Sequence, residues 1–166
     1  MKRLNKDILS YLKWCAEKFL SYRPRSEFEV AQYLRRKMKI KHPEALEEQD
    51  DYIKETIEYY KETSGINDEE FVNWWVQERS YFKPKGERAL RQELRQKGVA
   101  QELVDQTLAA HQPNESELLK QLVNQKAQLS DLSSKKGVEK LTQHLLRRGF
   151  SYNEIKKAIA DFKNVE

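Results

Sequence analysis

Apolar residues recur along most of this chain every three or four positions, with polar residues between them. Leu90 and Leu94 are four residues apart, as are Leu141 and Leu145, and only polar residues separate the members of each pair. This spacing follows one face of an α-helix and does not fit a strand, where alternate residues share a face. The pattern predicts nine helices, at residues 6–22, 26–39, 44–63, 68–82, 87–97, 101–111, 115–129, 135–148 and 152–162.

Residues suited to helix ends stand at the predicted boundaries. A Ser or Asn is followed three residues later by Glu at four predicted helix starts, namely Ser26 with Glu29, Asn67 with Glu70, Asn114 with Glu117, and Ser151 with Glu154. This spacing is typical of a capping box, in which the two side chains satisfy free backbone N–H groups of the first turn. Gly98 and Gly149 follow predicted helices, where glycine adopts the left-handed conformation at low cost.

The same unit recurs along the chain. The segment at 23–37 aligns with the one at 83–97 at a shift of 60 residues, and 83–99 aligns with 135–150 at a shift of about 51. We therefore expect an all-α fold of three tandem three-helix repeats in an elongated, curved array. The first repeat spans 5–64 and has a long acidic third helix, the second spans 65–112, and the third spans 113–166.

Composition supports this fold and excludes others. The 166 residues include only 5 Gly and 4 Pro, too few for a fold rich in hairpins, and 17 aromatic residues argue against disorder. Only 38% of the residues are hydrophobic, which suits the narrow seams of stacked repeats. Cys15 has no second cysteine to pair with. No apolar run is long enough to span a membrane, and the N-terminal residues lack the apolar core of a signal peptide. We expect a cytoplasmic monomer without membrane contact.

Charge is distributed unevenly around a net value of +4. Residues 44–70 contain eleven Asp and Glu against Lys54 and Lys61, a net charge of −9, so the rest of the chain carries +13. Arg88, Arg91 and Arg95 share one helix face, opposite the leucine seam. Exposed basic residues are usually only solvated, but this stripe recurs in each repeat. The predicted residues for binding a protein partner or DNA are Arg35, Arg36, Lys39, Arg88, Arg91, Arg95, Lys97, Lys136, Lys140 and Arg147, with His144 in the third stripe.

Catalytic chemistry is hard to find in the sequence. His42, His111 and His144 are isolated from other metal-ligating residues, so we expect no metal site and no cofactor. Cys15 lies among apolar neighbours and is expected to be a buried structural thiol. We predict that the protein is not an enzyme.

Aromatic residues at helical spacing are predicted to belong to the core and not to stack on nucleic-acid bases. They are Tyr11, Trp14, Phe71, Trp74 and Trp75.

Several motifs, in order along the chain, resemble the RecX family of bacterial regulators of the RecA recombinase. They are Tyr-Arg-Pro-Arg-Ser-Glu at 22–27, Leu-Arg-Arg-Lys at 34–37, Gly-Ile-Asn-Asp-Glu-Glu-Phe at 65–71, Arg-Ala-Leu-Arg-Gln-Glu-Leu-Arg-Gln-Lys-Gly-Val at 88–99, and Leu-Leu-Arg-Arg-Gly-Phe at 145–150. The likeness runs from about residue 7 to 162. Residues 64–68 depart from it, because members often have Gly-Tyr-Leu-Asp-Asp there. The third repeat is also less typical.

The resemblance implies an all-helical, non-enzymatic protein of three three-helix repeats. It implies binding to RecA in the groove of its filament on single-stranded DNA, inhibition of ATP hydrolysis and strand exchange, and thereby a role in recombination, DNA repair and the SOS response. Some members also bind DNA, so a weak direct DNA contact is expected. Occlusion of duplex entry and capping of filament growth both remain open as mechanisms.

Two other functions fit the residues alone. Basic second helices joined by short turns also suit a DNA-binding module of helix-turn-helix type or a transcription regulator, although no single helix is rich in Asn, Gln and Arg. A scaffold that binds through the acidic segment 44–70 is the third hypothesis.

Overall fold

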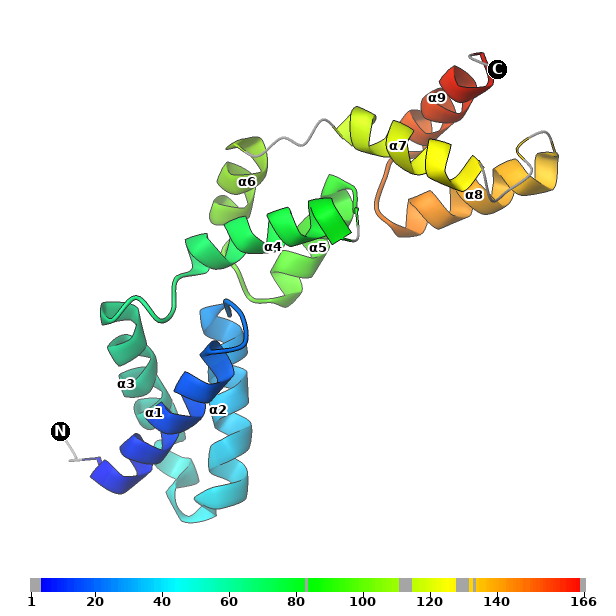
Figure 1. Cartoon of the computed structure of the whole chain (residues 1–166). Helices are drawn as coiled ribbons and strands as arrows, with labels where there is room; N and C mark the ends of the chain where they lie inside the picture. The colour runs from blue at the N-terminus through cyan, green and yellow to red at the C-terminus, as the bar shows by residue number, and fades with distance from the viewer. Residues whose placement is uncertain (1–3, 83, 111–114, 128–131, 133, 165–166) are drawn as a thin grey trace. The chain divides into compact units, whose positions relative to one another are not determined.

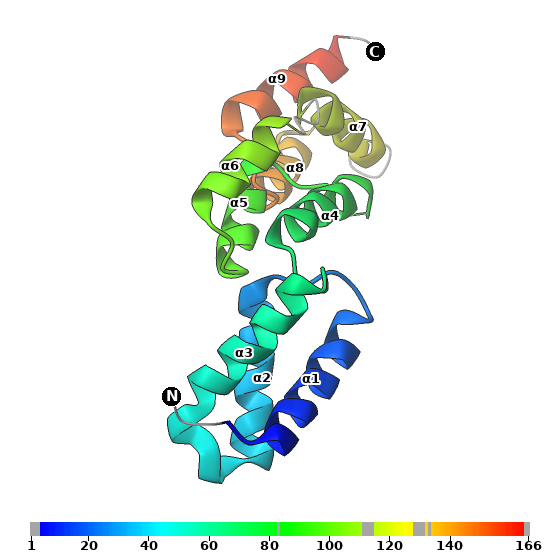
Figure 2. The same ribbon diagram turned by 90° about the vertical axis from the view of Figure 1, so that its left-hand side faces the viewer.

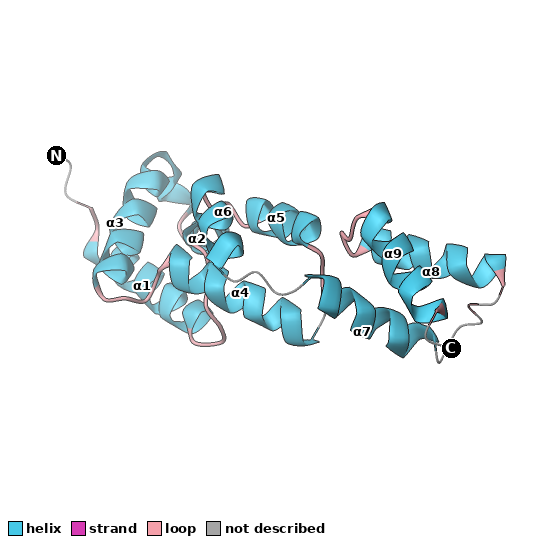
Figure 3. Cartoon of the chain, turned by 90° about the horizontal axis from the view of Figure 1, so that it is seen from above, coloured by secondary structure: helices cyan, strands magenta, loops and turns pink. Residues whose placement is uncertain are grey.

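The regular elements of the computed structural model are all helical in the residues it describes, which are 4–82, 84–110, 115–127, 132 and 134–164 (Figures 1 and 3). The all-α prediction is therefore confirmed. The α-helices are α1 (Lys6–Leu20), α2 (Glu27–Lys41), α3 (Gln49–Glu62), α4 (Asp68–Phe82), α5 (Glu87–Gln96), α6 (Gln101–Ala110), α7 (Glu115–Ala127), α8 (Lys135–Arg147) and α9 (Tyr152–Lys163), with a 3-10 helix, η1 (Pro43–Glu48), before α3.

The segment at 44–63 differs from its prediction as one helix. Its first turn and a half is the 3-10 helix η1, and α3 begins only at Gln49. The backbone at Ala45 (φ −111°, ψ 19°) is not helical, so one α-helix does not run through this stretch. The other predicted helices agree within two residues wherever the chain is described. Residues 111, 128 and 129, predicted as helix ends, lie outside the described residues.

Residues 1–74 and 95–103 form one compact unit, in which α1, α2 and α3 lie side by side (Figure 2). Their apolar faces meet in a core in which Leu12, Val30, Leu34 and Met38 are fully buried. Cys15 lies in this core, as predicted. The three helices therefore share one hydrophobic core, although each is too short to be stable alone.

Residues 75–94 and 104–166 form the second unit. Here α9 packs against both α7 and α8 (Figure 1). The core of these three helices includes Leu119, Val123, Leu145 and Ile155, all of which are almost completely buried. The apolar spacing that predicted α7, α8 and α9 is the spacing of this shared core.

The predicted aromatic core is confirmed only in part. Phe71 and Trp75 are buried, but Trp14 is 51% exposed, so its prediction as a core residue is wrong. Trp14 stacks on Tyr11 at 6.4 Å between ring centroids, and the Lys18 ammonium lies 4.1 Å from its ring centroid. These neighbours cover part of the ring without enclosing it, which leaves an aromatic surface on α1.

The predicted capping boxes are formed differently from one another. Ser151 and Glu154 make the complete reciprocal pair at the start of α9. Ser26 accepts a hydrogen bond from the backbone N–H of Glu29, but the Glu29 carboxylate bonds to Arg23 and Lys97 instead of reaching back to the cap. Asn67 accepts from the backbone of residues 69 and 70, and Asn114 lies outside the described residues.

The second helix of one repeat begins where the second helix of the next repeat ends, and we call this contact the inter-repeat joint. In the first joint the Ser26 hydroxyl donates to the Lys97 carbonyl oxygen at 2.7 Å. In the second joint the Gly86 N–H donates to the Arg148 carbonyl oxygen at 2.9 Å. Each joint lies within one of the two units. The terminal carbonyl groups of α5 and α8, which lack partners inside their own helices, thus gain one from the preceding repeat.

A carboxylate completes each joint from the other side. Asp68, the first residue of α4, accepts from the Glu27 backbone N–H at 2.8 Å. Glu115, the first residue of α7, accepts in the same way from the Glu87 N–H at 3.3 Å. Burial raises the pKa of both carboxyl groups, in spite of these hydrogen bonds. Both joints therefore satisfy a free N–H group at a helix start with an acidic side chain of the next repeat.

Glycine closes each joint. Gly98 and Gly149 have φ values of +72° and +91°, as their predicted places after helix ends require. A Cβ atom at Gly98 would overlap the Phe28 side chain, and one at Gly149 would overlap Ala89. Both positions therefore need glycine for conformation and for close approach.

Replacing Gly98 tests the first joint. Gly98→Ala puts a Cβ into the Phe28 side chain and forces alanine to a positive φ, so we expect the free energy of unfolding to fall by about 1–3 kcal/mol. Urea denaturation of both proteins measures the difference. Gln96→Ala, at an exposed position of the same helix end, is the control and should change stability little. Equal stability of Gly98→Ala and the parent chain would contradict the joint.

Candidate partner-binding surface

The first predicted basic stripe lies on α2 and is exposed. Arg35, Arg36 and Lys39 are all exposed, and their role in binding stays a prediction. Arg35 forms an exposed ion pair with Asp50 of α3, at 3.2 Å between Nη2 and Oδ1. The start of the acidic segment therefore neutralises one member of this stripe, although an exposed pair of this kind contributes little to stability.

The second predicted stripe lies on α5, opposite the buried leucine seam. Arg88 and Arg95 are exposed, whereas Arg91 is ion-paired with Glu87 one turn earlier and with Asp105 of α6. The hydrogen bonds that Arg91 donates to Asp105 and Glu87 raise the pKa of Arg91. Arg91 thus links α5 to α6. Arg88 and Arg95 are the exposed members of this stripe, so their charges are more accessible to a partner than that of Arg91.

Lys97 does not belong to the α5 stripe. It lies in the first joint, where its ammonium donates to the Glu29 carboxylate at 2.6 Å and its carbonyl oxygen accepts from Ser26. Glu29 is also held by Arg23, at 2.9 Å between Nη2 and Oε1. Although burial opposes ionisation, the hydrogen bonds from Arg23 and Lys97 lower the pKa of Glu29. Lys97 is thus engaged in the fold.

The third predicted stripe lines a hollow of about 620 Å³ in the third repeat. Lys136, Lys140 and Arg147 of α8 are exposed on its walls, together with the half-buried His144. Lys126 of α7 joins them, a residue that no sequence pattern had singled out. The residues of the third stripe therefore line one hollow, together with a fifth basic residue from another helix.

A second charged cluster, around Glu93 of α5, was also missed. Its carboxylate accepts from the Trp75 indole N–H at 3.0 Å, from Arg79 at 2.9 Å and from Lys85. Burial opposes ionisation here too, but the hydrogen bonds from Lys85 and Arg79 lower the pKa of Glu93. The cluster fixes α4 against α5. No sequence pattern marks it, because its members are up to 18 residues apart.

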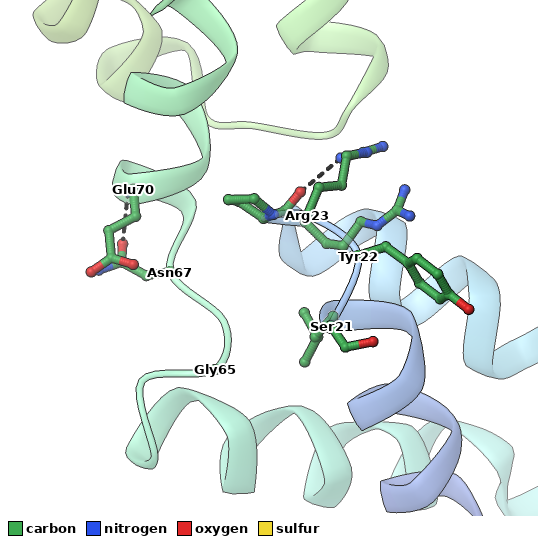
Figure 4. Close-up of a pocket in the computed structure, with 9 residues that line it drawn as sticks. Ser21, Tyr22, Arg23, Gly65, Asn67 and Glu70 are labelled. Atoms are coloured by element: carbon green, nitrogen blue, oxygen red, sulfur yellow. Dashed lines mark hydrogen bonds between the residues drawn. The ribbon is translucent and has the colours of Figure 1, made fainter. Parts of the chain in front are cut away.

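The α1–α2 loop borders a smaller hollow of about 310 Å³, closed on the other side by Gly65, Asn67 and Glu70 (Figure 4). Arg23 donates to the Pro24 carbonyl oxygen and also pairs with Glu29. Tyr22 is 83% exposed, and Figure 4 shows its ring directed away from Asn67 and Glu70. Within the motif at 22–27, Arg23 is therefore engaged in the first joint, whereas Tyr22 is exposed.

The described part of the chain holds no group of three or more potential metal ligands. Among the described helices, none is long and apolar enough to cross a membrane. The sites that the structure does show are exposed basic surfaces and the joints between repeats. Whether the basic stripes of different repeats form one surface stays a prediction.

The fold and its recurring joints define an all-helical protein of three tandem three-helix repeats. Comparison with known families matches the first, second and third three-helix domains of RecX to residues 15–38, 67–108 and 114–159. The chain belongs to the RecX family.

Relatives and solved structures agree with this assignment. The chain is 29% identical to the regulatory protein RecX of Oceanobacillus iheyensis over 150 residues, and 34% identical to that of Streptococcus pyogenes over 154 residues. These matches cover 89% and 91% of this chain but only 52% and 55% of the relatives, so the chain spans about half their length.

Two solved structures have the same fold. The crystal structure of RecX from Lactobacillus salivarius matches with a TM-score of 0.70 at 25% identity, covering 96% of this chain and 99% of that one. A second RecX crystal structure matches with a TM-score of 0.68 at 22% identity, covering 94% and 79%.

The ion pairs of Glu29 predict a pH-dependent contribution to stability. Because folding lowers the pKa of Glu29, its contribution is present above the ordinary carboxyl pKa and is lost as the pH falls through the lowered value. At neutral pH, Glu29→Gln should lower the free energy of unfolding by about 1–3 kcal/mol. The difference from the parent chain should shrink on acidification, as measured by thermal unfolding at several pH values. Glu55→Gln, exposed on α3, is the control, and a loss that did not depend on pH would contradict this role.

Proposed function

We propose that this protein binds RecA and its filament on single-stranded DNA and inhibits ATP hydrolysis and strand exchange. It thereby regulates recombination and DNA repair without catalysis of its own. Membership of a family whose relatives are named regulatory proteins supports a regulatory role. The resemblance of the motifs to regulators of RecA supports this partner.

The observation that carries the proposal is the exposed arginine pair on α5. Arg88 and Arg95 are two turns apart on the face opposite Leu90 and Leu94, so they are presented by a helix anchored in a core. Guanidinium groups bind carboxylates and phosphates through two parallel hydrogen bonds. A filament of RecA on DNA offers both kinds of group, repeated along its length.

A protein bound to the filament in this way inhibits strand exchange through the place that it occupies. The described helices present basic side chains on exposed faces, so several modest contacts to one partner can form together. A protein attached in this way obstructs what the filament must admit or rearrange during strand exchange. Contacts of this kind do not require a deep pocket.

The test is an assay of ATP hydrolysis and strand exchange by the cognate RecA on single-stranded DNA, with and without this protein. We expect inhibition at stoichiometric levels or below. Arg88→Gln combined with Arg95→Gln should raise the concentration for half inhibition about tenfold, because two arginine contacts are lost. The inhibition should also weaken as salt is added, because exposed charges are screened.

A matched control removes the same charge elsewhere. Lys156→Gln combined with Lys157→Gln changes two exposed lysines of α9 and should leave inhibition nearly unaltered. Arg91 is kept in all variants, because its pairs with Glu87 and Asp105 are part of the fold. RecA activity that is unchanged by the parent protein would refute the proposed function. Equal losses in the two double variants would refute the role of the α5 pair.

A further inference from the structure

The hollow in the third repeat gathers more positive charge than its surroundings offset. Its walls are lined by Lys126, Lys136, Glu139, Lys140, Leu141, Gln143, His144 and Arg147. Among these, four residues are permanently cationic and Glu139 is the one carboxylate, which leaves three positive charges before His144 is counted. Within the residues that the structure describes, no ion pair is formed by any of the four cations.

The cations form a row. Lys136, Lys140, His144 and Arg147 follow one another at steps of three or four residues, so they share one face of α8. Lys136 and Arg147 are eleven positions apart, which corresponds to about 16 Å along a helix. Lys126 adds a positive charge from α7. The row therefore suits an extended ligand with several negative charges better than a single small ion.

His144 has an unused nitrogen at this place. Its Nε2 atom is out of contact with solvent and has no hydrogen-bond partner among the described residues. Burial lowers the pKa of His144, and the positive charges of Arg148, Lys126 and Arg147 lower it further. These groups, together with Lys136, Lys140 and Glu139 along the hollow, are the charged neighbours contributed by α7 and α8. Unoccupied, the site keeps His144 neutral at neutral pH.

We propose that this hollow binds phosphate groups, and that His144 takes up a proton when the hollow is filled. The phosphodiesters of a nucleic-acid strand and a free polyphosphate share the required chemistry: negative oxygens that accept several hydrogen bonds and lie in a short row. The length of the α8 row favours the strand, since a positively charged groove that follows the backbone is the usual way to hold single-stranded nucleic acid.

The direction of the proton linkage follows from the charges. A phosphate in the hollow offsets the repulsion from Arg148, Lys126 and Arg147, so it raises the pKa of His144 back toward its ordinary value. Binding is then tighter at about pH 6 than at about pH 8, and protons are taken up from the buffer. Phosphodiesters keep the same charge across this range, so the pH dependence belongs to the protein.

The experiment measures binding of a fluorescent oligothymidylate to the full chain by anisotropy, at about pH 6 and about pH 8. Lys136→Gln combined with Lys140→Gln should weaken binding about tenfold or more, because two phosphate contacts are lost. Lys156→Gln combined with Lys157→Gln, from α9 of the same repeat and outside the hollow, should change it less than about twofold. His144→Gln should bind like the parent at the higher pH and lose the gain at the lower pH.

Calorimetry in buffers of different ionisation enthalpy counts the proton taken up, which should disappear in His144→Gln. Unlabelled oligothymidylate and inorganic tripolyphosphate are compared as competitors at equal phosphate concentration. Stronger competition by tripolyphosphate would assign the hollow to a free polyphosphate, and stronger competition by oligothymidylate would assign it to a strand. Circular dichroism confirms that each variant is folded.

Three results would overturn the proposal. They are equal losses in the two lysine variants, a pH dependence that persists in His144→Gln, and displacement of the oligonucleotide by polyglutamate as readily as by phosphate probes, which would assign the hollow to an acidic protein. The probes contain no RecA, so this test can fail while the proposed function stands, and the reverse.

Discussion

Backbone groups at helix ends, which have no partner inside their own helix, determine how this chain is joined. The start of α2 receives its partners from the next repeat: Asp68 accepts from the backbone of Glu27, and the Lys97 carbonyl accepts from the Ser26 hydroxyl. The start of α5 is completed in the same manner by the third repeat. Because a buried polar group without a hydrogen bond is costly, each repeat needs the next one at this point. The cores of the separate three-helix groups supply stability, and the joints supply their connection.

This dependence explains why the family motif at residues 22–27 lies in a loop. Arg23 holds Glu29, Glu29 holds Lys97, and Ser26 both caps α2 and bonds to the end of α5. Arg23 and Ser26 of this loop are thus occupied by contacts within the fold. The glycines of the joints are also required by these contacts, since a side chain at Gly98 would overlap Phe28.

Almost the whole fold could be predicted from the sequence, and about half of the candidate surface. Helices were predictable because apolar spacing and caps are local. The error at η1 lies at Ala45, whose non-helical backbone the apolar spacing does not mark. The partners of single charges were not predictable. Glu29 fits a capping box by spacing, but its partner Lys97 is 68 residues away. Trp14 also shows the limit, because spacing assigns it to the core whereas it is half exposed.

The repeats differ in how many carboxylates they contain for each basic residue. Residues 5–64 contain twelve Lys and Arg and twelve Asp and Glu, and there Arg35 finds Asp50 on the adjacent helix. Residues 113–166 contain ten against seven, so the row on α8 lacks such neighbours. Burial lowers the pKa of His144, and the positive charges of Arg148, Lys126 and Arg147 lower it further, a repulsion that a bound anion would offset. An excess of positive charge indicates a binding surface best where few carboxylates neutralise it. In the described part of the chain, the hollow lined by α7 and α8 is such a place.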